Sequence, residues 1–151
     1  MAETEQERWQ RNFAELLQEL RVAQAGVQIL FAFLLILAFS PGFDERDGFV
    51  RTVYLVALLS AAAAAALIIA PVAHHRLMFR RHQKPMLVRD AHRMAFAGLM
   101  LVIVSMVSAV LLATDVVLSR PLAIVVAAAT GTVFVLLWAV FPLARRQQNV
   151  D

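Results

Sequence analysis

Cysteine is absent from this 151-residue chain, and charged residues make up only 17% of it. Without cysteine there can be no disulfide, no thiolate metal site and no cysteine nucleophile, so the redox compartment cannot be inferred. The scarcity of charge is matched by a hydrophobic content of 61%. A soluble domain of this length could not bury that much apolar surface, so lipid must cover the excess. We therefore expect a single integral membrane domain over residues 1–151, too short to include a separate catalytic domain.

The chain contains four apolar runs long enough to cross the hydrocarbon core as helices, at residues 22–39, 52–73, 94–114 and 121–143. Backbone groups in lipid must bond one another, and the alternating pattern of a transmembrane β-barrel is absent. The predicted fold class is therefore all-α, an integral membrane four-helix bundle. The start of the chain is acidic, unlike the basic start of a secretory signal, so we expect the first run to remain as a membrane anchor.

Small residues are grouped within three of these runs, at Ala61–Ala66, at Gly98 and Ser105, and at Ala127–Thr132. Lipid offers no hydrophobic gain for helix association, so close contact relies on small side chains and on polar groups that find partners. These clusters of small residues predict packing faces within one chain or between chains. A homo-oligomer is expected on this basis.

The basic residues lie almost entirely on one side of the expected bundle. Connection 74–93 is strongly basic, whereas connection 40–48 carries net negative charge. With four spans both termini fall on the side of the basic connection, and of the 14 Lys and Arg residues only Arg46, Arg51 and Arg120 remain on the other. The positive-inside rule then predicts that both termini and the basic connection are cytoplasmic.

The first helix is expected to be longer than its span. From Trp9 to Leu20 the apolar residues share one face and the charged residues the other, and no helix breaker separates this stretch from Val22. We therefore predict one long helix whose N-terminal part, residues 1–21, is amphipathic and cytoplasmic.

Polar groups are predicted to continue from this amphipathic part into the first span along one stripe. Arg21, Gln24 and Gln28 are spaced to share a face, and Glu15 and Glu19 lie one turn apart before them. A polar residue within a span suggests a functional site, because burying it without a partner costs about 1 to 3 kcal/mol. In one interpretation the glutamines hydrogen-bond a neighbouring helix while Glu19 and Arg21 reach the headgroups. In the other they line a hydrated ion path with Glu19 and Arg21 at its cytoplasmic mouth.

Asp115 lies where the third span ends and is a further candidate for the ion path. A carboxylate at a helix C-terminus opposes the helix dipole, so an ion pair with Arg51 or Arg120 on the same side is one interpretation. The other is a cation-attracting group at the outer mouth of a pathway. Glutamine has no titratable proton, so a proton-coupled mechanism would need Glu15, Glu19 or Asp115.

The basic connection combines cationic and apolar residues in a way that suits contact with anionic headgroups. Its candidate lipid-binding residues are Arg76, Arg80, Arg81, Lys84, Arg89 and Arg93. Four histidines also fall here, but the surrounding cations would repel a metal ion, so no metal site is expected. The bilayer already accounts for the positive charge, so nucleic acid is not an expected partner. No phosphate-binding loop or nucleophile–base–acid set is found, and neither enzymatic activity nor a cofactor is expected.

Three stretches carry a family resemblance: residues 15–35 (ELLQELRVAQAGVQILFAFLL), residues 69–80 (IAPVAHHRLMFR) and residues 114–117 (TDVV). They resemble a mostly actinobacterial four-span membrane family catalogued as a domain of unknown function. Some of its members carry the automatic label "sodium:proton antiporter", to which no mechanism is attached. The resemblance implies a bacterial inner-membrane protein but assigns no role to the matched residues, which are Glu15, Glu19, Arg21, Gln24, Gln28, Pro71, His75, Arg76, Arg80 and Asp115.

The sequence thus leads to two functional hypotheses. The first is a small homo-oligomeric channel or transporter for an ion, with the polar stripe of the first helix lining the path. The alternative is a non-transporting accessory or scaffold protein that binds lipid or a partner membrane complex. Small multidrug exporters also have four spans, but here glutamines stand where those proteins have a first-span carboxylate, so their function is not transferred.

Overall fold

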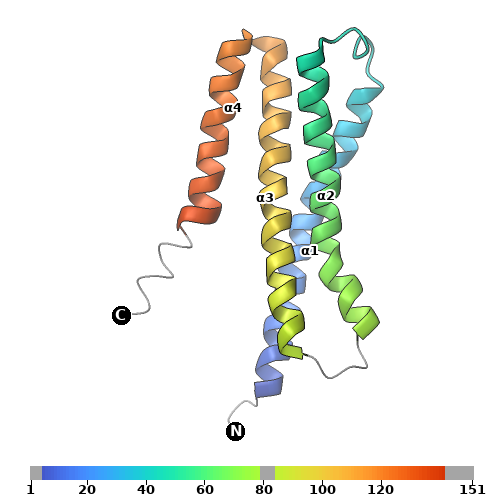
Figure 1. The fold of residues 1–151 in the computed structure, drawn as a ribbon, viewed down its shortest axis with the longest axis vertical. Helices are drawn as coiled ribbons and strands as arrows, with labels where there is room; N and C mark the ends of the chain where they lie inside the picture. The colour runs from blue at the N-terminus through green and yellow to red at the C-terminus, as the bar shows by residue number, and fades with distance from the viewer. Residues whose placement is uncertain (1–4, 79–83, 142–151) are drawn as a thin grey trace.

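The computed structural model describes residues 5–78 and 84–141. This part of the chain folds into four long helices and no strand. The helices are α1 (Glu5–Ala38), α2 (Gly48–Met78), α3 (Lys84–Val117) and α4 (Arg120–Val135), and α4 continues into a π-helical turn, η1 (Leu136–Val140). Successive helices run antiparallel, so α1 begins at the end of the molecule where α2 ends and α3 begins, and α4 runs toward that end (Figure 1). The predicted all-α helical bundle is confirmed.

Four helical segments of the described part are long and apolar enough to cross a membrane: Leu17–Ala38, Gly48–Ala73, Arg93–Val117 and Arg120–Val140. The protein is therefore a multi-pass membrane protein. The helix α1 is continuous over 34 residues, so its amphipathic part and its span form one helix, as the sequence predicted. It ends before Pro41 and Gly42, where the positive φ of 76° at Gly42 turns the chain toward α2.

The bundle is open rather than closed. The most extensive contact joins α2 and α3, and α1 lies against α2 with a smaller contact to α3. Among the described residues α4 packs along α3, and Arg120 at its start also reaches Phe49 at the start of α2; Figure 1 shows α4 standing at one side of the molecule. The core is therefore formed by α1, α2 and α3, with α4 attached to its flank.

The contact between α2 and α3 is built from small residues. Ala57, Ala61 and Ala64 on α2 have no exposed surface, whereas Ala62 and Ala63 between them are exposed. On α3 the hydroxyl of Ser105 donates a hydrogen bond of 2.8 Å to the carbonyl oxygen of Ala57. The alanine run is thus a one-sided packing face, in which every third or fourth residue lets the backbones approach.

The helix α1 packs through a narrow apolar edge. Leu20, Val27 and Leu34, seven residues apart, are its buried large side chains. Leu20 and Val27 join Ala64 and Ile68 in one hydrophobic cluster. This spacing is typical of a helix that meets its neighbour along a seam, and it leaves the rest of α1 facing outward.

Gly98 permits a close approach of α3 to α2. A Cβ atom at this position would lie 2.9 Å from Cγ1 of Ile68 and 3.4 Å from the carbonyl oxygen of Ala64.

We predict that Gly98→Ala lowers the free energy of unfolding in detergent by about 1–3 kcal/mol, because the two helices must separate. Gly26→Ala is the matched control, since a Cβ there meets nothing within 4 Å, and it should be neutral or stabilising by up to about 1 kcal/mol. Equal unfolding free energies for the two variants would contradict the close α2–α3 contact.

Candidate functional site

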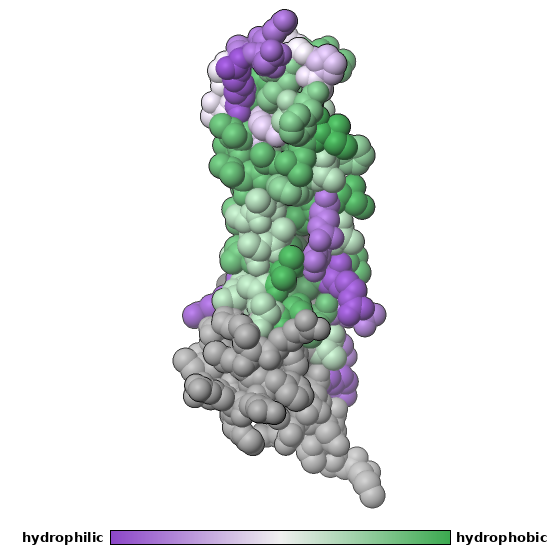
Figure 2. All heavy atoms as spheres, turned by 90° about the vertical axis from the view of Figure 1, so that its right-hand side faces the viewer, coloured by the Kyte–Doolittle hydropathy of each residue, from purple (hydrophilic) through white to green (hydrophobic). Residues whose placement is uncertain are grey.

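The residues of the predicted stripe lie on one flank of α1, outside its buried edge. Arg21 and Gln28 are exposed, and Gln24 is half-buried beside Leu20 and Val27. Arg21, Gln24 and Gln28 are strongly polar residues within the span segment Leu17–Ala38, and Figure 2 shows hydrophilic surface that extends into the apolar belt along one side of the molecule. We call these three residues the α1 polar face.

The α1 polar face has no partner within the described part of the chain. The side chains of Gln24 and Gln28 form no hydrogen bond with another described residue, and neither Arg21 nor Glu19 forms an ion pair there. Glu15 differs, because its carboxylate lies 3.9 Å from Arg11 one turn away, with both side chains largely exposed. The hydrogen bonds that the amides require in lipid must therefore come from outside these residues.

The residues whose burial the structure describes form no polar route through the bundle. Among these residues Ser105 is the buried polar one, and its hydroxyl is already bonded to the backbone of α2. A path lined by the α1 polar face would consequently have to run between molecules rather than through one.

The polar face covers only half of the span. Gln28 lies near the middle of the segment Leu17–Ala38. Beyond it the positions on the same side of α1 are Ala32 and Leu35, both apolar and exposed. The face is thus a polar patch that begins at the amphipathic end of α1 and stops near mid-membrane.

A second polar cluster lies at the opposite end of the molecule, around Arg120. Its guanidinium donates to both carboxylate oxygens of Asp115, at 3.1 and 3.3 Å, and to Asp47 at 2.6 Å. It also lies 4.6 Å from the centre of the Phe49 ring. The predicted ion pair of Asp115 is present, and Arg120 rather than Arg51 is the partner, because Arg51 donates to the carbonyl oxygen of Asp44.

The sequence analysis missed Asp47, which links three helices through this cluster. Its carboxylate accepts a hydrogen bond of 3.0 Å from the backbone N–H of Val50 and so caps the start of α2. Its other oxygen accepts a hydrogen bond from Arg120 at the start of α4. The same guanidinium forms the ion pair with Asp115 near the end of α3. The bond from Val50 and the nearby Arg120 lower the pKa of Asp47 below its ordinary value of 3.8. An Asp-Gly pair directly before an apolar run was the signal that could have identified this cap.

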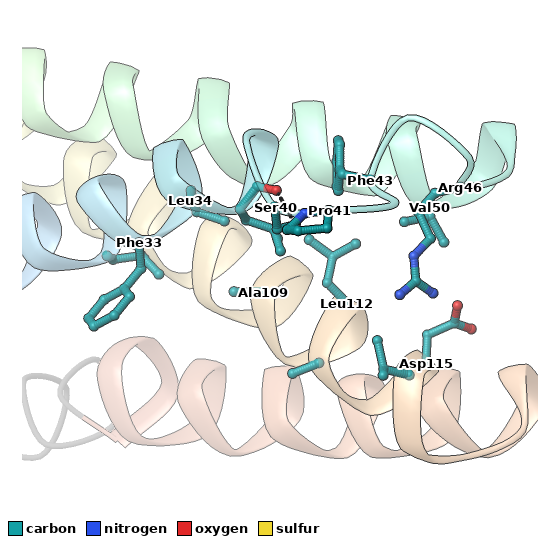
Figure 3. A pocket seen from close by; sticks show the side chains of 14 residues that line it. Phe33, Leu34, Ser40, Pro41, Phe43, Arg46, Val50, Ala109, Leu112 and Asp115 are labelled. Carbon is teal, nitrogen blue, oxygen red and sulfur yellow. Dashed lines mark hydrogen bonds between the residues drawn. The ribbon is translucent and has the colours of Figure 1, made fainter.

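An apolar groove of about 300 Å³ opens beside this cluster, between α1, α3 and the loop that joins α1 to α2. Figure 3 shows Arg46 and Asp115 facing each other at its mouth, with Leu34 and Phe33 of α1 farther along it. The sequence analysis did not anticipate this groove. Asp115 is thus both the partner of Arg120 and a residue of the groove's rim, with its side chain only 10% exposed.

Most of the predicted headgroup-binding residues have side chains outside the described part of the chain. Arg93 is exposed at the start of the third span segment. Arg80 and Arg81 lie outside the described residues, as do the side chains of Arg76, Lys84 and Arg89 and of the four histidines. The lipid contact of this connection stays a prediction.

The model of DUF6328, a family of unknown function, matches residues 2–142, which is nearly the whole chain. The chain belongs to this family. No curated protein and no solved structure matches the chain. Membership in DUF6328 brings no activity with it, so function is argued from the α1 polar face and the groove.

The charge of Asp47 provides a test of the cluster around Arg120. Because its pKa is lower in the folded state, its stabilising effect is present above about pH 4 and is lost as the pH falls through the folded-state pKa. We predict that Asp47→Asn, which keeps an oxygen for the helix cap, is less stable than the wild type at about pH 6. The difference between the two proteins should shrink as the pH falls below about 4, as measured by thermal unfolding in detergent.

Asp44→Asn is the matched control for this experiment, because the Asp44 carboxylate forms no hydrogen bond with another described residue. It should show no such pH-dependent difference from the wild type. A constant gap between Asp47→Asn and the wild type at every pH would contradict the role of the Asp47 charge.

Proposed function

We propose that this protein is a non-transporting membrane scaffold that assembles through the α1 polar face. The observation that carries the proposal is the pair of amides, Gln24 and Gln28, on an outward flank of α1 within the apolar belt, with no hydrogen bond to the described part of the chain. Exposed to acyl chains, each amide would lack the hydrogen bonds it makes in water. A neighbouring transmembrane helix that supplies donors and acceptors removes this penalty.

A second copy of this chain is the partner that best fits the amides. A glutamine side chain carries both a donor and an acceptor, so identical residues can satisfy each other across a two-fold axis. The buried edge of α1 is already used inside the bundle, which leaves the adjacent flank for the neighbour. Arg21 and Glu19 lie at the end of the span, from which their charged groups extend to the headgroups.

An ion path between copies is the second candidate function. It is favoured by the exposed Glu19 and Arg21 at one end of the polar face, where an ion would enter. It is disfavoured by Ala32 and Leu35, which make the second half of the same side of α1 apolar. At the far end, the Asp115 carboxylate is bound by Arg120 on both oxygens.

Replacing both glutamines tests the assembly. We predict that Gln24→Leu with Gln28→Leu weakens self-association in liposomes about tenfold or more, because interhelical amide hydrogen bonds contribute about 0.6–2 kcal/mol each. Energy transfer between donor- and acceptor-labelled protein at several protein-to-lipid ratios measures this change. Thr132→Val is the matched control, since Thr132 is an exposed polar residue whose hydroxyl already bonds Ala128 of its own helix. Equal association of the wild type and the double variant would contradict the proposal.

Ion flux in the same vesicles separates the two candidate functions. Sealed liposomes that contain the wild-type protein should stay tight to H⁺, Na⁺, K⁺ and Cl⁻. A flux that the double glutamine variant changes would instead establish the ion path and overturn the scaffold proposal.

The charge distribution supports an orientation in a bacterial inner membrane with both termini and connection 74–93 in the cytoplasm. In this arrangement Arg93 and the other basic residues of the connection contact anionic headgroups.

The chain has no cysteine, so single cysteines at Gly42 and Gln83 can be introduced directly to test the orientation. We predict that a membrane-impermeant thiol reagent added outside intact cells labels Gly42→Cys and not Gln83→Cys. The reverse pattern would overturn the orientation.

A further inference from the structure

We propose that the groove between α1 and α3 binds one acyl chain of an anionic phospholipid, with the headgroup phosphate at Arg46. The groove lies beside the α1–α2 loop, and its walls come from the second half of the first span and the last turns of the third (Figure 3). It is distinct from the α1 polar face, which lies in the first half of the same span. The proposal is therefore independent of self-association through that face.

The walls of the groove suit a hydrocarbon chain. Leu30, Phe33 and Leu37 of α1 face Ala109, Ala113 and Val116 of α3 across it. Because these residues lie within membrane-spanning segments, lipid chains rather than water surround the groove in a bilayer. Its volume of about 300 Å³ is at the small end of ligand-binding pockets, which fits one chain rather than two.

The small side chains of α3 create the space. Ala109 and Ala113 lie one turn apart on the wall of the groove, and Ala113 is exposed. The helices α1 and α3 make only a small contact with each other, so no side chain of α1 fills the gap left by these alanines. A larger residue at position 113 would occupy the groove without entering the α2–α3 packing.

The mouth of the groove offers one positive charge to a headgroup. The guanidinium of Arg46 forms no ion pair with another described residue, although it faces Asp115 (Figure 3). The Asp115 carboxylate is already bound by Arg120 at 3.1 and 3.3 Å, and Arg120 also binds Asp47. Arg46 is therefore available for a phosphate, which a guanidinium can bind through two parallel hydrogen bonds.

The loop holds Arg46 in this place. The ring of Phe43 packs edge-on against the buried Tyr54 of α2, with ring centres 4.8 Å apart. The backbone N–H of Arg46 donates to the carbonyl oxygen of Phe43 at 3.2 Å. This contact ties the backbone at Arg46 to the same end of the bundle as the mouth of the groove.

Native mass spectrometry of the full-length protein in mild detergent tests the proposal. Phosphatidylglycerol and phosphatidylcholine with the same acyl chains are added separately, with the matching free fatty acid as a third probe. We expect one phosphatidylglycerol per protomer, bound several-fold more tightly than phosphatidylcholine or the fatty acid.

Ala113→Leu should reduce phosphatidylglycerol binding about tenfold, a loss of about 1.4 kcal/mol. Arg46→Gln should remove the preference for phosphatidylglycerol over phosphatidylcholine while a chain still binds.

Two control variants match these changes in size and charge. Ala97→Leu adds the same bulk at an exposed position of α3 outside the groove, and Arg8→Gln removes an exposed arginine far from it. Both should bind phosphatidylglycerol like the wild type. Ala113→Met serves as a second groove-filling variant if thermal unfolding shows that Ala113→Leu is destabilised.

Three results would overturn the proposal. The first is no retained lipid, and the second is equal binding by the wild type and both groove-filling variants. The third is dissociation of the oligomer by Ala113→Leu in the energy-transfer assay, which would make the groove a contact between copies. Loss of lipid binding with self-association intact would separate this site from the scaffold function.

Discussion

This structure depends on one constraint: in lipid the hydrophobic effect does not drive one helix against another. Helices must instead gain contact energy by approaching closely, and the α2–α3 contact does so through Ala57, Ala61 and Ala64 on one side and Gly98 on the other. Ser105 adds a hydrogen bond to the Ala57 carbonyl at the same contact. The remaining helices attach to this pair, α1 through a narrow edge of larger side chains and α4 along α3.

This arrangement determines where the polar groups of α1 face. Leu20, Val27 and Leu34 occupy the edge that meets the bundle, so the adjacent flank with Gln24 and Gln28 faces outward. The ion cluster around Arg120 has the opposite character, because Asp47 and Asp115 satisfy it within the chain. The polar groups around Arg120 therefore bind one another within the chain. The amides of Gln24 and Gln28, by contrast, have no partner in the described part of the chain.

The sequence predicted the features that depend on local pattern alone. Long apolar runs identified the spans, and the missing breaker before Val22 predicted a continuous α1. Charge proximity predicted Arg51 or Arg120 as the partner of Asp115, and the structure shows Arg120. The sequence could not predict which neighbour each face meets. In lipid both the core and the exterior are apolar, so hydrophobic periodicity does not distinguish inside from outside. The attachment of α4 along α3 and the groove beside Arg46 follow from packing that no local pattern encodes.

The central claim is that the α1 polar face contacts protein, and spin-label accessibility in bilayers tests it most directly. Labels at Ala25 and Ala32, both exposed and close to Gln28, are compared with a lipid-facing reference at Val125 on α4, which is 61% exposed. The account predicts that oxygen and a water-soluble relaxation agent both reach Ala25 and Ala32 poorly, because a second copy covers them. Oxygen accessibility equal to that of Val125 would mean that lipid covers this face, and high accessibility to the water-soluble agent would mean that water does. Either result would contradict the account.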